Sequence, residues 1–83
     1  NVAKDLINFN IALLNAVNNN TAVPIEENLK NLKDSDIKLM SEYNLATIYL
    51  KLGQKEKALE IFEKLRNALP GWQAVKEKIK ELR

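Results

Sequence analysis

The chain has 83 residues, and its 13 basic and 11 acidic side chains leave a net charge of +2. Its 46% of apolar residues is too many for a disordered chain, and its small net charge gives no basic field for nucleic acid. It has neither cysteine nor histidine and only two glycines and two prolines, which favours one small helical domain and excludes disulfides, thiol nucleophiles and the usual zinc ligands.

A long uncharged stretch lies between Leu6 and Ile25, close to the roughly 20 residues that cross a membrane. Six asparagines and one threonine fall inside it, and lipid would leave their polar groups unsatisfied. No membrane span is therefore predicted. The chain begins at Asn1 instead of Met, so we expect a fragment of a larger protein. The lack of cysteine is compatible with the cytoplasm and with bacterial export alike.

Five helices are predicted in chain order, from the spacing of apolar residues and from the residues that begin and end each segment. Pro24 suits a first helical turn, and the acidic cluster that starts at Asp34 suits a helix N-terminus. Gly53 and Pro70 end the helices before them. No segment alternates with a period of two, so no strand is expected. The expected helices are 2–18, 24–33, 36–52, 55–68 and 72–82.

The first and third helices show the same sequence pattern at an offset of 34 residues, since FNIA at 9–12 matches YNLA at 43–46. The same offset pairs Asn19 with Gly53, and both residue types accept the left-handed conformation that closes a helix. The second and fourth helices match at an offset of 33, so we expect one residue gained or lost in the loop between them. The repeating unit is a helix pair, and the last helix begins a third copy.

A helix pair with this period, large residues in its first helix and a small residue in its second, resembles the tetratricopeptide repeat. The match is close over about 39–72 and degenerate over about 5–37, where Asn15 stands at the family's tyrosine position. Glu42 replaces a large apolar residue of the family pattern, and an alanine replaces its glycine. The residues that match the family are Leu45, Ala46, Tyr49, Gly53, Ala58, Phe62 and Pro70.

The resemblance implies an all-α fold of antiparallel helix pairs stacked as a short right-handed α-solenoid. We expect a single domain over 1–83, with a degenerate repeat at 5–37, a second repeat at 38–71 and a capping helix at 72–83. The capping helix has one apolar stripe and a charged remainder, as the end of a stacked array requires. Its lysines alternate with glutamates one turn away, which weakens any field for nucleic acid or anionic lipid.

The first and third helices each have two apolar stripes, although one stripe is enough to pack against a partner helix. On the first helix, we expect Ile7, Ile11 and Leu14 to form the packing stripe. In proteins of the resembled family the first helices line a concave face, so the resemblance places the second stripes there, with polar residues beside them. The predicted partner-binding residues are Leu6, Phe9, Asn10, Leu13, Met40, Tyr43, Asn44, Thr47, Leu50 and Lys51.

These residues favour a non-catalytic protein–protein interaction module whose concave face binds a mostly apolar peptide or helix. One subset of the family grips a C-terminal carboxylate, but Phe9 and Leu13 stand at the corresponding places here. The alternative is a structural, self-associating segment in which a second copy or neighbouring repeats cover the same face. Catalysis is not expected, because acids such as Glu26 and Asp34 stand at helix starts; no cofactor or metal is predicted.

Overall fold

The computed structural model describes residues 2–83, which form five α-helices and no strand, so the predicted all-α fold is confirmed. The predicted helix limits agree with the structure to within one residue, except at the end of the second helix. The helices are α1 (Val2–Asn19), α2 (Val23–Leu29), α3 (Ser35–Lys51), α4 (Lys55–Ala68) and α5 (Gln73–Leu82).

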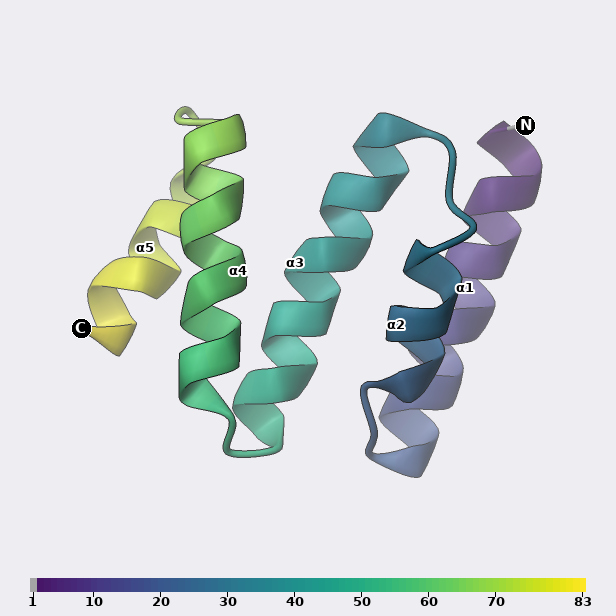
Figure 1. Cartoon of the computed structure of the whole chain (residues 1–83), viewed down its shortest axis with the longest axis horizontal. Coiled ribbons are helices and arrows are strands. Elements are labelled where there is room, and N and C mark those ends of the chain that lie inside the picture. Colours follow the sequence, from purple (N-terminus) through teal and green to yellow (C-terminus); the bar gives the residue numbers. More distant parts are fainter. Residues whose placement is uncertain (1) are drawn as a thin grey trace.

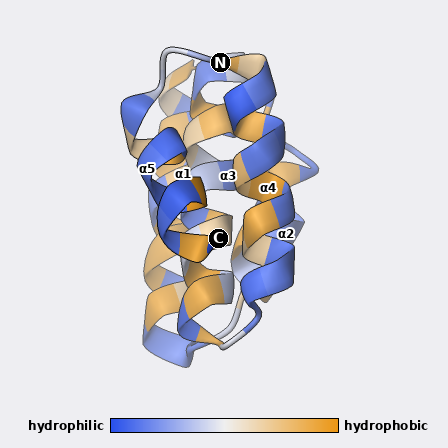
Figure 2. Cartoon of the chain, turned by 90° about the vertical axis from the view of Figure 1, so that its left-hand side faces the viewer, coloured by the Kyte–Doolittle hydropathy of each residue, from blue (hydrophilic) through white to orange (hydrophobic). Residues whose placement is uncertain are grey.

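Consecutive helices run in opposite directions and are joined by short loops (Figure 1). Seen from the side, α2 and α4 lie on one side of the molecule and α1 and α5 on the other, with α3 between them (Figure 2). The Cα atoms extend over 35 × 28 × 16 Å, a flat shape about two helices thick. The central helix, α3, packs against α1, α2 and α4. Few of its apolar positions are therefore free to face solvent.

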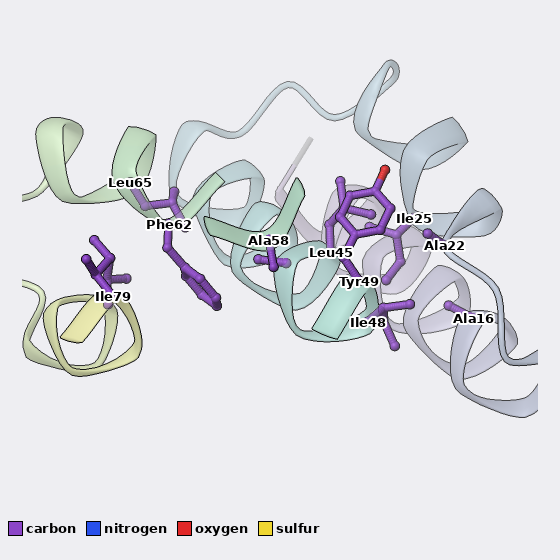
Figure 3. Packing of buried hydrophobic residues seen from close by; sticks show 12 residues of the cluster. Ala16, Ala22, Ile25, Leu45, Ile48, Tyr49, Ala58, Phe62, Leu65 and Ile79 are labelled. Carbon is purple, nitrogen blue, oxygen red and sulfur yellow. The ribbon is translucent and has the colours of Figure 1, made fainter. Parts of the chain in front are cut away.

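One continuous apolar core joins the five helices (Figure 3). Phe62 and Leu65 of α4 are fully buried near Ile79 of α5, which forms one end of the cluster. Ala46 of α3 and Ala58 of α4 are also fully buried. Small side chains at such positions allow two helix backbones to approach closely, so an alanine meets the same need as the glycine of the resembled pattern.

Buried positions in the first two helices recur 33 residues later, so the expected offset of 34 between the first and third helices is wrong by one residue. Asn20 and Gly53 follow α1 and α3, and both have positive φ, at 53° and 78°. The left-handed partner of Gly53 is therefore Asn20 and not Asn19, and α2 begins three residues after Asn20 whereas α4 begins two residues after Gly53. The pairs of buried residues related by this offset are Phe9 and Glu42, Ala12 and Leu45, Ala16 and Tyr49, Ile25 and Ala58, and Leu32 and Leu65.

The positive φ of Gly53 leads to a prediction about stability. A Cβ atom at Gly53 would meet no other atom within 4 Å, so a substitution there is limited by backbone conformation alone. We expect Gly53→Ala to lower the free energy of unfolding by about 1–2 kcal/mol. Gly53→Asn should cost less, because asparagine already adopts this conformation at residue 20. Urea unfolding of both variants measures the difference, and equal losses would contradict this explanation.

The second helix ends at Leu29 and not at residue 33, so the prediction for its end is wrong. The N–H of Leu32 still bonds to the carbonyl of Asn28, at 3.2 Å. The next two N–H groups, of Lys33 and Asp34, bond to a carboxylate on α1 instead of continuing the helical pattern. Residues 30–34 therefore connect α2 to α3 as turn and coil, and α2 is only half as long as α4.

Candidate protein-binding surface

The buried face of α1 consists of Asp5, Phe9, Ala12 and Ala16, spaced four, three and four residues apart. Phe9 is only 7% exposed and packs with Leu32 and Ile37, so its predicted place on an open binding face is wrong. The cause is the one-residue error in the repeat offset. With the observed offset, Phe9 is equivalent to the buried Glu42, the position where the family pattern has a large apolar residue.

The opposite side of α1 is apolar and exposed. Ile7, Ile11 and Leu14, expected to form the packing stripe, are 58%, 53% and 60% exposed, so that expectation is wrong. Leu6, a predicted binding residue, is exposed as predicted, and Leu13 is half-buried against the core. We call the exposed set the α1 apolar face: Val2, Leu6, Ile7, Ile11, Leu14 and Val17.

The α1 apolar face has no charged residue from Leu6 onward, and the exposed Lys4 lies about one helical turn before Ile7. No charged residue occurs between Leu6 and Ile25, and Asn10, another predicted binding residue, is exposed in this stretch. A surface of this kind gives no long-range attraction to charged partners. Its contribution to binding would come from removing apolar side chains from water, with the asparagine amide available for hydrogen bonds.

The predicted binding residues on α3 divide into two groups. Tyr43 is half-buried, with its ring stacked on Trp72 at a centroid distance of 5.2 Å and edge-on to Phe62 at 5.5 Å. It closes the core toward α5 instead of standing free. Leu50 also packs against the core, and Thr47 donates a hydrogen bond to the carbonyl of Tyr43 at 3.1 Å. The more open residues are Met40, which is 48% exposed, Lys51, which is exposed, and Asn44, which is half-buried.

Sequence reasoning missed Asp5, the acid that holds α1 against the α2–α3 loop. Its Oδ2 accepts hydrogen bonds from the N–H groups of Lys33, at 3.0 Å, and Asp34, at 2.8 Å. These bonds and the nearby positive charges lower the pKa of Asp5 below its ordinary value of 3.8. The signal was present in the sequence, because Asp5 lies one helical turn before Phe9 and therefore on the same face of the helix.

The lowered pKa of Asp5 predicts a pH dependence. Because the folded state favours the charged carboxylate, its stabilising effect is present above pH 3.8 and is lost as the pH falls through the lower folded pKa. We expect Asp5→Asn to reduce the melting temperature at pH 7 and to flatten the acid side of the stability curve. Asp36→Asn, at an exposed acid on α3, is the matched control. If the Asp5→Asn variant loses stability at acid pH as steeply as the wild type, the acid dependence does not come from Asp5.

The remaining acids with candidate chemical roles have structural partners. Asp34 caps α3 as predicted, since its Oδ1 accepts from the N–H of Ile37 at 3.0 Å. Glu26 accepts a short hydrogen bond from the hydroxyl of Tyr49. Within residues 2–83, no three acidic side chains gather into a group that could hold a metal ion. No helix in this range is long and apolar enough to cross a membrane.

Comparison with known proteins adds no family: no family model, curated protein or solved structure matches the chain significantly.

Proposed function

We propose that this chain is a non-catalytic protein–protein interaction module of the tetratricopeptide type, whose two helix pairs and capping helix stack as a short right-handed solenoid. The bound partner is a mostly apolar helix or peptide. The observation that supports the proposal best is the α1 apolar face, half of whose surface stays in water although α1 already packs against α2 and α3. Large exposed apolar patches of this kind mark interaction sites.

The repeat offset extends this face onto α3. At 33 residues, Ile7 is equivalent to Met40, and both are about half exposed. Ile11 is likewise equivalent to Asn44, which is half-buried. Since α1 and α3 contact each other and hold the same place in their pairs, equivalent residues on them would line one inner face. The proposed binding surface therefore keeps Leu6, Asn10, Met40, Asn44 and Lys51 from the sequence prediction and adds Ile7, Ile11, Leu14 and Val17.

The exposed side chains of this face would add substantially to the affinity for a partner that covers them. Full burial of one large aliphatic side chain contributes about 1.5–3 kcal/mol, so a half-exposed one contributes roughly 1 kcal/mol when covered. Ile7, Ile11 and Leu14 together would then contribute about 3 kcal/mol, which corresponds to more than a hundredfold in affinity. A neutral, apolar partner surface gains most from this face, whereas a charged one would lose hydration without a counter-charge.

The test is a peptide selection against the domain, followed by calorimetry on the selected peptides. Peptides that use the face should be apolar, and the triple variant Ile7→Ser/Ile11→Ser/Leu14→Ser should bind them at least tenfold more weakly. Circular dichroism should remain helical, because these side chains are exposed. The matched control is Val23→Ser/Leu69→Ser, which removes exposed apolar residues elsewhere. Selected peptides that bind the triple variant and the wild type equally would contradict the proposal.

A second copy of the chain is the other candidate occupant, and the uncharged stretch after Leu6 favours it. Two identical faces of one charge sign would repel, but the stretch after Leu6 has no charge to oppose self-pairing. Sedimentation velocity would then show a dimer that the triple serine variant converts to a monomer. A wild-type monomer at every concentration up to the millimolar range would exclude this alternative.

A further inference from the structure

A separate pocket is lined by residues from the end of α2 and from the neighbouring sides of α3 and α4. Its volume is about 290 Å³. It lies where α2 stops early: Leu29, its last residue, is equivalent to Phe62, after which α4 continues to Ala68. The turns that α2 lacks leave the neighbouring sides of α3 and α4 uncovered. The pocket is lined by Leu29, Lys30, Lys38, Glu42, Leu45, Ile61 and Lys64.

The position of the pocket on α3 separates it from the proposed binding surface. Glu42 follows Met40 by two residues, which is roughly 200° around an α-helix. Met40 is half exposed on one side, whereas Glu42 on the other side is a buried residue that lines the pocket. A ligand in the pocket would therefore leave Met40 and the α1 apolar face uncovered.

The walls of the pocket are apolar, and its rim is basic. Leu29, Leu45 and Ile61 provide the apolar surface. Of the lysines, Lys64 already pairs with Glu42, with Nζ 3.2 Å from Oε2. The carboxylate of Glu42 is thus occupied, and its side chain is only 10% exposed.

The two other lysines leave an excess of positive charge. Lys30 pairs with Glu27 outside the pocket at 3.6 Å, and both side chains are more than half exposed, so that pair is weak. Lys38 is exposed and has no ion-pair partner within residues 2–83. An anionic group at the rim would therefore meet Lys38 first, while an apolar group beside it would lie against the leucine and isoleucine side chains.

We propose that this pocket binds a small apolar carboxylate, a molecule with a short hydrocarbon chain or ring and one anionic head group. The volume is near the lower end of the range of small-molecule sites, which limits the apolar part to a short chain. Lys38, together with the weakly paired Lys30, attracts a negative head group and repels a positive one. The three apolar side chains stabilise the bound chain by excluding water.

The experiment is a titration of the isotope-labelled chain with octanoate, followed by amide chemical shifts. Saturable shifts are expected at Leu29, Leu45 and Ile61. In the series butanoate, hexanoate, octanoate, affinity should rise by up to about fourfold for each added methylene until the pocket is full. Octanol and octylammonium, with the same chain and a neutral or positive head group, should bind more weakly than octanoate.

Variants of Lys38 test the role of charge, because this exposed lysine can change without loss of packing. Lys38→Gln should weaken octanoate binding by about two- to fivefold, Lys38→Glu should weaken it further, and Lys38→Arg should restore it. Lys76→Gln, at an exposed lysine on α5, is the control. Equal binding of octanol and octanoate, shifts on Ile7, Ile11 and Leu14 in place of the pocket, or no saturable shift would each overturn the proposal.

Discussion

Replacing Phe62 by alanine is expected to lower the free energy of unfolding by about 3–5 kcal/mol, the largest effect of any single substitution proposed for this chain. Phe62 is the largest fully buried side chain. It lies in the core near Leu65 and Ile79, and its ring meets Tyr43 edge-on. Its removal would leave a cavity. Because α4 is held between α3 and α5, the helices cannot move together to close it. A domain this small has a total stability near the lower end of about 5–15 kcal/mol, so much of the variant should be unfolded at 37 °C.

The other phenylalanine provides the comparison. Phe9 packs in a small satellite cluster with Leu32 and Ile37, near the end of the molecule, and retains some exposure. Phe9→Ala should therefore cost less than Phe62→Ala, because α1 and the α2–α3 loop can move to fill the space. Thermal unfolding followed by circular dichroism measures both. If Phe9→Ala is the more damaging, the main core is not centred on α3 and α4.

Replacing Tyr49 by phenylalanine is expected to cost about 2 kcal/mol, the second largest effect. The Tyr49 hydroxyl donates to the Glu26 carboxylate and so joins α3 to α2, and a hydrogen bond to a charged group contributes more than a neutral one. Phenylalanine preserves the ring and its contact with Lys57, whose Nζ is 5.4 Å from the ring centre. The change therefore isolates the hydroxyl group. Tyr43→Phe is the matched control, because the Tyr43 hydroxyl has no hydrogen-bond partner within residues 2–83.

The same contact predicts a loss of stability in alkali. Burial and the bond to Glu26 raise the pKa of Tyr49 from 10.0 to about 12. Because the folded pKa is the higher one, the contribution is fully present below pH 10 and is lost as the pH rises from 10 toward about 12. Urea unfolding at pH 9 and pH 11.5 should show a loss in the wild type that Tyr49→Phe lacks. An equal loss in both proteins would assign the alkaline effect to other groups.

The helices and their limits could be predicted because their signals are local. Asp34 begins α3 through its own side chain, and Gly53 ends it through its own backbone freedom, so each can be recognised without knowing the rest of the fold. Leu45 and Ile48 of α3 are both buried and lie three residues apart, as residues on one helical face do. A sequence pattern is sufficient wherever one residue determines the local structure.

The two errors arose where the structure depends on distant contacts. Beyond the end of α2, the N–H groups of Lys33 and Asp34 bond to Asp5, 28 and 29 residues earlier in the chain, and no local pattern near Leu29 indicates that contact. The buried face of α1 was predicted by aligning FNIA at 9–12 with YNLA at 43–46. Both the buried and the exposed face of this helix contain apolar residues. Hydrophobic spacing then fits two rotations of the helix almost equally well. The residue with left-handed backbone conformation after α1 would have given the correct offset. The sequence has three consecutive asparagines at 18–20, however, and does not indicate which of them adopts that conformation.

The packing of each helix mainly against its chain neighbours has a consequence for folding kinetics. All helix pairs with extensive packing are consecutive or next-but-one in the chain, so the sequence separation of interacting residues is short. Chains of such low contact order close only small loops before their interactions form, and they fold in microseconds to milliseconds. Temperature-jump relaxation should therefore show one fast phase. The contacts of Asp5 with residues 33–34 and of Tyr43 with Trp72 close the longest loops among those described above, so we expect them to form late.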